Sequence, residues 1–138
     1  MQDLIGTKLG QYTITSLLGT GGMAAVYRAR QESVKRDVAI KVIQSTLAND
    51  PDFIRRFERE AETVAQISHP HILKVFDFGE QGGLLYIVME LLPGGSLADL
   101  LARGNLPVDR IVKLFEQIAS ALDYAHTLGI VHRDLKPQ

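Results

Sequence analysis

The chain has 138 residues, of which 46% are hydrophobic, and its 15 basic and 16 acidic side chains leave a formal charge of −1. This composition fits one globular unit, and the near-neutral balance argues against a binder of nucleic acid or of an anionic membrane surface. The sequence has no cysteine, which excludes disulfides, thiolate zinc sites and a cysteine nucleophile. No stretch approaches the ~18 apolar residues of a membrane-spanning helix, so a cytoplasmic location is expected for this segment.

The first part of the chain predicts strands, because short stretches rich in β-branched and apolar residues are separated by turn residues. These stretches are residues 12–18, 25–30 and 37–44. In the third stretch Val38, Ile40 and Val42 alternate with Ala39 and Lys41. The alternation predicts one buried face and places Lys41 on the other face, together with Ala39.

A helix is predicted next along the chain. Asp50 is a favourable N-cap, Pro51 fits the first helical position, and apolar side chains recur at one-turn spacing as far as Val64. The helix should end before the Ser68-His69-Pro70 segment, since the residue before a proline disfavours the helical conformation. Two further strands are predicted after it, at residues 72–78 and 84–91.

The character of the chain changes to helical after Pro93-Gly94-Gly95. Ser96 can cap a short helix that reaches Arg103, and Pro107 opens a long helix that stops at Leu128-Gly129. An apolar stripe on the long helix indicates a core-facing side: Ile111, Phe115, Ile118 and Leu122. We therefore expect an α+β fold, with a five-stranded antiparallel sheet and one helix, then a glycine hinge and helices, and a cleft between two subdomains.

The segment from Leu18 to Val26 joins the first two predicted strands and contains Gly19, Gly21 and Gly22. Backbone N–H groups can approach a phosphate closely only where no large side chain intervenes. A phosphate-binding loop and an ordinary glycine-rich hairpin are both open on this segment alone. A dinucleotide-binding fold is disfavoured, because that motif runs from a strand into a helix.

Lys41 also leaves two interpretations open. A lysine that faces the interior of a fold needs an anionic partner, whereas a lysine on an edge strand is solvated. In the predicted helix, Glu60 lies near the apolar face that contains Phe57 and Val64. An ion pair between Lys41 and Glu60 would hold the ammonium group toward the phosphates of a nucleotide.

The segment His132-Arg133-Asp134-Leu135-Lys136-Pro137 resembles the catalytic loop of protein kinases. The motifs before it follow the order of that family: the glycine-rich loop, Val38 to Lys41 on a third strand, a helix with a glutamate, and a hinge. The segments Leu18–Met23 and Arg56–Ala61 are most similar to bacterial kinases of eukaryotic type. The resemblance implies a protein-kinase-like fold, in which residues 10–91 form the small lobe, 92–95 the hinge and 96–138 the start of the helical large lobe.

The resemblance also implies chemistry for particular residues: transfer of the γ-phosphate of ATP to serine or threonine side chains of proteins. Asp134 would accept the proton of the substrate hydroxyl, Lys136 would neutralise the transferred phosphate, and Lys41 with Glu60 would hold the other phosphates. Arg133 resembles the arginine that contacts a phosphorylated activation loop, and His132 resembles a packed structural residue.

The nucleotide would lie between Val26 and Ala39, with Met89 as the gatekeeper and the backbones of Glu90 and Leu92 on the adenine edge. The full implied nucleotide site is Leu18, Gly19, Thr20, Gly21, Gly22, Met23, Ala24, Ala25, Val26, Ala39, Lys41, Met89, Glu90 and Leu92. The chain departs from the family pattern at Ala24, which replaces the third glycine and restricts the backbone there.

The family's magnesium ligands follow the catalytic loop, so we expect them beyond residue 138 and expect no metal site within the chain. Without them the 138-residue chain, as a fragment, is expected to be inactive alone. The triplet Asp77-Phe78-Gly79 spells the family's metal motif, but it precedes Asp134 and is interpreted as a coincidence.

Two other classes of function compete with this one: a pseudokinase-like nucleotide-binding scaffold or partner-binding module, and a small-molecule phosphotransferase of kinase-like fold. The retention of Lys41, Glu60 and Asp134 favours the protein kinase. The resemblance further implies that a parent protein can carry a later transmembrane anchor, and that N-lobe dimerisation occurs in some members.

Overall fold

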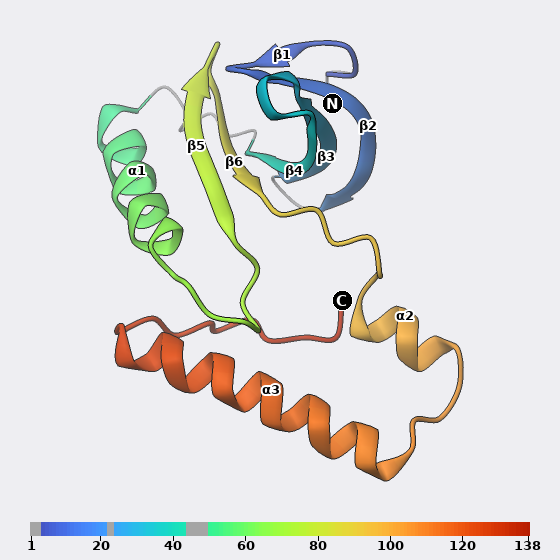
Figure 1. Ribbon diagram of the computed structural model, residues 1–138. Coiled ribbons are helices and arrows are strands. Elements are labelled where there is room, and N and C mark those ends of the chain that lie inside the picture. The colour runs from blue at the N-terminus through green and yellow to red at the C-terminus, as the bar shows by residue number, and fades with distance from the viewer. Residues whose placement is uncertain (1–3, 22–23, 44–49) are drawn as a thin grey trace. The chain divides into compact units, whose positions relative to one another are not determined.

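The computed structural model describes residues 4–21, 24–43 and 50–138. The chain forms two compact units, one within residues 1–67 and 74–91 and the other within 68–73 and 92–138. The first unit is built on one antiparallel sheet with the strand order β1-β2-β3-β4-β6-β5 (Figure 1). Its strands are β1 (Lys8–Leu9), β2 (Tyr12–Gly21), β3 (Ala24–Gln31), β4 (Arg36–Ile43), β5 (Val75–Gln81) and β6 (Leu84–Met89). A short 3₁₀ turn, η1 (Glu32–Val34), joins β3 to β4.

The five predicted strands are all present, and the α+β class is confirmed, but the sheet has a sixth strand that the sequence analysis missed. β1 has only two residues, Lys8 and Leu9, which pair with Thr13 and Tyr12. Two residues are too few to show a period of two, so composition could not reveal this strand. β2 also runs to Gly21, three residues further than predicted, so Gly19 is held in the β2–β3 ladder.

Other boundaries also differ from prediction by one to three residues. β5 begins at Val75 rather than at Ile72, because the segment before it turns, with the amide of Ile72 donating to the carbonyl of His69. β6 ends at Met89 rather than at Leu91. The predicted end of the third strand, Gln44, lies outside the described residues.

The core of the first unit lies on the face of the sheet that the alternation in β4 predicted. Val38, Ile40 and Val42 are fully buried. Ile40 stands in register between Tyr27 on β3 and Val88 on β6, so three strands contribute side chains to one row. Cross-strand rows of this kind are the unit from which a sheet builds its packed face.

Helix α1 (Pro51–Ala65) also belongs to the first unit and begins as predicted, with the Asp50 carboxylate accepting from the amide of Asp52 at 2.9 Å. It packs against β5, where the rings of Phe57 and Phe78 meet edge to face with centroids 6.5 Å apart. Figure 1 shows α1 running alongside β5. The sheet face around Phe78 is therefore the side that the helix covers.

The second unit contains α2 (Leu97–Ala102) and α3 (Val108–Thr127). Ser96 caps α2 as predicted, Pro107 stands at the N-cap of α3, and Gly129 adopts a φ of +76° where α3 ends. None of the described helices is long and apolar enough to cross a membrane.

Candidate active site

One face of the sheet gathers the residues that the sequence assigns to the nucleotide. The register places Gly19, Val26 and Lys41 side by side on β2, β3 and β4. Ala39 and Met89 are paired in the neighbouring row. Directly opposed residues in an antiparallel sheet point to the same face, so these five positions share one surface.

The glycines of this face leave the backbone accessible. Gly19 and Gly21 are exposed, and a Cβ atom at either position would meet nothing within 4 Å. An anionic group can therefore approach the backbone there, as a phosphate-binding loop requires. Gly22 and Met23, also assigned to the nucleotide, lie outside the described residues.

The remaining loop positions differ in what they can offer a ligand. Leu18 and Thr20 are exposed and Ala24 is half-buried. Ala25 is buried in the core opposite Val42, on the other face of the sheet, so only its backbone is available to a nucleotide. A motif match assigns every residue of the loop to the nucleotide, whereas the pleat of a strand points every second side chain to the opposite face of the sheet.

Lys41 lies on an interior strand, because β4 is paired on both sides, with β3 through Val26 and with β6 through Ile87. The edge-strand interpretation of Lys41 is therefore wrong. Its side chain is nevertheless exposed on the face that Val26 and Ala39 share. An exposed ammonium group on a half-apolar surface is available to an anionic ligand.

The expected ion pair between Lys41 and Glu60 is not formed within the described residues, and both side chains are exposed. The packing of α1 gives the reason. The helix contacts β5 through Phe57 and Phe78, and β6 separates β5 from β4 in the sheet. The pairing stays a prediction for a nucleotide-bound form.

The end of β6 offers backbone groups. Met89 is half-buried, and the amide of Glu90 donates to the carbonyl of Lys74 at 2.9 Å. The carbonyl of Glu90 is thus the group of that residue that an adenine amino group could use. Leu92, exposed, begins the second unit.

In the second unit, the catalytic-loop motif forms a local charged pair. The Nζ atom of Lys136 lies 3.1 Å from Oδ2 of Asp134, and their side chains are 56% and 76% exposed. The amide of Asp134 donates to Nδ1 of His132 at 3.2 Å, and Arg133 between them adopts a φ of +63°. A left-handed backbone at a residue with a side chain is strained, and such strain is common at functional sites.

His132 is exposed, which differs from the expectation that it packs beneath the site. Its Nδ1 accepts the hydrogen bond from the amide of Asp134. His132 therefore shapes the loop through the backbone of Asp134 rather than through packing.

The catalytic-loop segment also makes a backbone hydrogen bond that was not predicted from the sequence. The amide of Ala98, in the first turn of α2, donates to the carbonyl of Pro137 at 2.9 Å. The same turn holds a reciprocal cap, in which Asp99 N donates to Ser96 Oγ at 3.2 Å and Ser96 N donates to Asp99 Oδ2 at 2.7 Å. These contacts with Ser96 hold the pKa of Asp99 below its usual value. The Ser-x-x-Asp spacing carries the signal for the cap.

Asp77 has a structural environment. Its Oδ2 accepts from the hydroxyl of Tyr12 at 3.0 Å, and its Oδ1 accepts from the amide of Phe78 at 2.9 Å. Burial, together with this carboxylate, raises the pKa of Tyr12 to about 12. The described residues contain no group of three His, Asp or Glu side chains that could hold a metal ion.

Comparison with known proteins identifies the class. Residues 12–138 match the protein kinase domain family. The chain is 46% identical over 134 residues to the serine/threonine-protein kinase PknE of Mycobacterium bovis, covering 96% of this chain and 24% of that protein. It is 44% identical over 136 residues to the serine/threonine-protein kinase PrkC of Bacillus subtilis, covering 97% of this chain and 21% of that protein.

A solved structure agrees with this class. The Mycobacterium tuberculosis PknI kinase domain superposes with a TM-score of 0.80 at 38% identity, over 96% of this chain and 54% of that one. The chain therefore belongs to the protein kinase family, among the bacterial serine/threonine kinases of eukaryotic type. It spans about a quarter of the length of the curated relatives it matches.

Proposed function

We propose that this chain supplies the nucleotide-binding sheet and the catalytic loop of an ATP-dependent serine/threonine protein kinase. The observation that carries the proposal is the row formed by Gly19, Val26 and Lys41, with Ala39 beside it, on one face of the sheet. Open glycine backbone, apolar surface and an exposed ammonium group are what the phosphates and base of a nucleotide require.

The catalytic loop supplies the chemistry in this proposal. Asp134 accepts the proton of a serine or threonine hydroxyl as that oxygen attacks the γ-phosphate. Lys136 offsets the negative charge of the transferred group, while Lys41, with Glu60 as its partner, holds the remaining phosphates. The 138-residue chain alone is proposed to be inactive, because transfer also needs Mg²⁺, whose ligands in this family follow the catalytic loop.

Organisation and location extend the same proposal. Residues 10–91 act as the small lobe, 92–95 as the hinge and 96–138 as the start of the large lobe. The catalytic domain is cytoplasmic, with no membrane contact from this segment, in a parent that can be anchored elsewhere.

Small lobes pair in a dimer, for which Val34 on η1, 60% exposed, is the apolar side chain to change first. A fall of the weight-average mass from that of a dimer toward that of a monomer after Val34→Asp, measured by analytical ultracentrifugation, would support the pairing.

The test of activity uses the parent protein that continues past Gln138. Phosphate transfer from labelled ATP to a protein substrate should fall by roughly 10²–10⁴ in kcat for Asp134→Asn, the usual contribution of a positioned base. Asp109→Asn, an exposed carboxylate in the first turn of α3, is the matched control and should keep full activity. Equal activity of Asp134→Asn and wild type would contradict the role of Asp134, whereas nucleotide binding without any transfer by the wild-type parent would favour the nucleotide-binding scaffold.

A further inference from the structure

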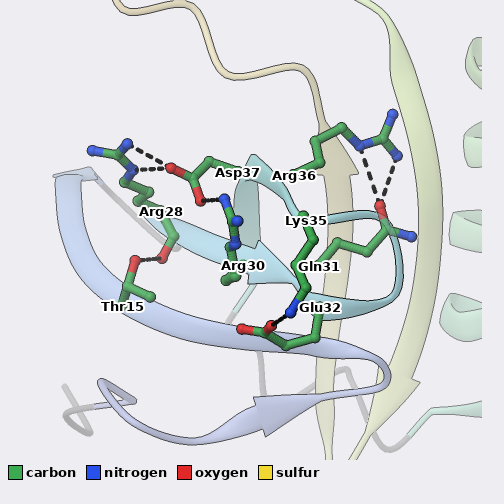
Figure 2. A network of polar contacts seen from close by, with 8 residues as sticks. All are labelled: Thr15, Arg28, Arg30, Gln31, Glu32, Lys35, Arg36 and Asp37. Carbon is green, nitrogen blue, oxygen red and sulfur yellow. Dashed lines mark hydrogen bonds and ion pairs between the residues drawn. The ribbon is translucent and has the colours of Figure 1, made fainter.

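A polar network continues the face of the sheet that carries Ala39 and Lys41, since Arg28 is paired with Ala39 (Figure 2). Its centre is Asp37 on β4. One carboxylate oxygen accepts from Nε and Nη2 of Arg28, at 3.2 and 2.6 Å, and the other accepts from Nη1 of Arg30 at 2.9 Å. The two guanidinium groups, that of Arg28 first, hold the pKa of Asp37 below its usual value. One carboxylate therefore serves two arginines, and several of their N–H groups remain for another anion.

The charges of the whole network are unequal. Lys35 pairs with Glu32 at 3.3 Å, but Arg36 donates to the neutral amide oxygen of Gln31 and stacks on the ring of Phe76. Its cations are Arg28, Arg30, Lys35 and Arg36, and its carboxylates are Glu32 and Asp37. The β3–β4 register places Arg36 opposite Gln31, which is buried on the core face, so the cations that share a face with Asp37 are Arg28 and Arg30. Two guanidinium groups around one carboxylate attract a further anion.

Three hydroxyl side chains from β2 line a hollow of about 490 Å³ together with Arg28, Arg30 and the carboxylates of Glu32 and Asp37. Thr13 is paired with Arg30 and Ser16 with Arg28 in the β2–β3 ladder, and both are half-buried. Thr15 differs, because the register steps from Ile14 to Ser16 across one residue of β3 and leaves Thr15 as the extra residue of a bulge. Bulges re-aim side chains, and Thr15 is exposed.

Access to Thr15 is favoured by its place in the sheet. β1 pairs only with Tyr12 and Thr13, so β2 forms an edge of the described sheet from Thr15 onward. The Thr15 hydroxyl donates to the carbonyl of Arg28 at 3.1 Å, which places it directly beside the backbone of an arginine (Figure 2).

We propose that Thr15 is a phosphorylation site whose phosphate is bound by Arg28 and Arg30. The proposal rests on the proposed function, since a kinase of this class would install the group. Oγ1 of Thr15 attacks the γ-phosphorus of ATP, the bond from that phosphorus to the bridging oxygen of ADP breaks, and the hydroxyl proton passes to the base of the attacking kinase. The new ester oxygen has no hydrogen for the Arg28 carbonyl, so the group turns outward. The guanidinium of Arg28 then pairs with the phosphate in competition with Asp37.

The first test measures the phosphate itself. Phosphoserine is incorporated at position 15 of the 138-residue chain, and its second pKa is followed by ³¹P NMR. That pKa should lie below the value of about 6 for a free phosphoserine peptide, because nearby guanidinium groups favour the dianion. Arg28→Gln with Arg30→Gln should restore the peptide value, whereas Arg55→Gln on α1 should not. A titration equal to that of the free peptide overturns the proposal.

The second test concerns acceptance of the phosphate. The unmodified chain is incubated with ATP, Mg²⁺ and an active bacterial serine/threonine kinase that labels a control protein in the same tube. Mass spectrometry should find phosphate at Thr15, and not at Thr13 or Ser16. A labelled control protein with no phosphate at Thr15 overturns the proposal. Failure of the proposed function would differ, since the parent would then label no protein while the ³¹P titration stayed as predicted.

Discussion

The strand-rich unit and the helical unit differ in how completely each buries its apolar side chains. All buried residues among those described belong to the strand-rich unit, from Leu4 to Val88. In the helical unit, α3 has no buried residue, and Phe115 and Val108 are 69% and 76% exposed. A curled sheet can bury one of its own faces, whereas an amphipathic helix needs a partner surface.

The difference shows which unit of this chain buries its apolar side chains by itself. The nucleotide face rests on a buried core, while Asp134 and Lys136 follow a helix whose apolar stripe is exposed at Ile111 and Phe115 and only half-buried at Ile118 and Leu122. The solved PknI kinase-domain chain is longer, since this chain covers 54% of it. We therefore expect the strand-rich unit to resist mutation of the helical unit, and the following changes test that expectation.

The largest effect should come from the core of the sheet. Ile40→Ala should lower the free energy of unfolding by about 2–5 kcal/mol, because Ile40 is fully buried and its loss leaves a cavity. Phe115→Ala, which removes a larger side chain from the exposed face of α3, should change it by less than about 0.5 kcal/mol. Urea unfolding followed by circular dichroism measures both. Equal losses would show that α3 is part of the same core.

A glycine in the sheet should give the next largest effect. A Cβ at Gly79 would lie 2.7 Å from the hydroxyl oxygen and 2.8 Å from Cζ of Tyr86, which is itself buried. Gly79→Ala should therefore cost about 1–3 kcal/mol through overpacking. Gly94→Ala is the control, because its Cβ would meet nothing within 4 Å. Thermal unfolding of the two variants should separate them clearly, and a neutral Gly79→Ala would mean that Tyr86 moves freely.

The cap of α2 should give a smaller and more local effect. Ser96→Ala removes the side-chain acceptor for the amide of Asp99 and should destabilise α2 by about 1 kcal/mol. Amide exchange should accelerate in residues 97–102 and stay unchanged in β4. Ser120→Ala on α3, which removes the contact of the Ser120 hydroxyl with His69 Nε2 and leaves the cap intact, should not change exchange in residues 97–102. Faster exchange in both regions would mean that the two units unfold together.

The smallest effect is a dependence on pH. The pKa of Asp99 is lower in the folded chain than its ordinary value of 3.8, because the amide and hydroxyl of Ser96 stabilise the carboxylate. Its contribution is therefore complete above that ordinary pKa and disappears as the pH falls through the lower folded value. Far-ultraviolet circular dichroism between about pH 5 and pH 2 should show less acid sensitivity for Asp99→Asn. Asp109→Asn should behave as wild type, and identical acid profiles for all three proteins would contradict the assignment.

Most strands of the sheet and most helix boundaries could be predicted from the sequence, because the alternation in β4 and the caps at Asp50 and Ser96 are local signals. It missed β1, which is too short to show a pattern. It also expected Lys41 to pair with Glu60, because residue spacing can place a glutamate near a helix face but cannot say which strand that helix will contact. The polar network around Asp37 was not predicted either, because its contacts depend on the register between neighbouring strands, which residue spacing does not give.

The most direct test of the difference in burial between the strand-rich unit and the helical unit is hydrogen–deuterium exchange on the 138-residue chain. We predict slow exchange for the ladder amides of β3, β4 and β6 and rapid exchange along α3, because all buried side chains among the described residues belong to the strand-rich unit. Protection of α3 equal to that of β4 would contradict the account, and would mean that the helical unit is as complete as the strand-rich one.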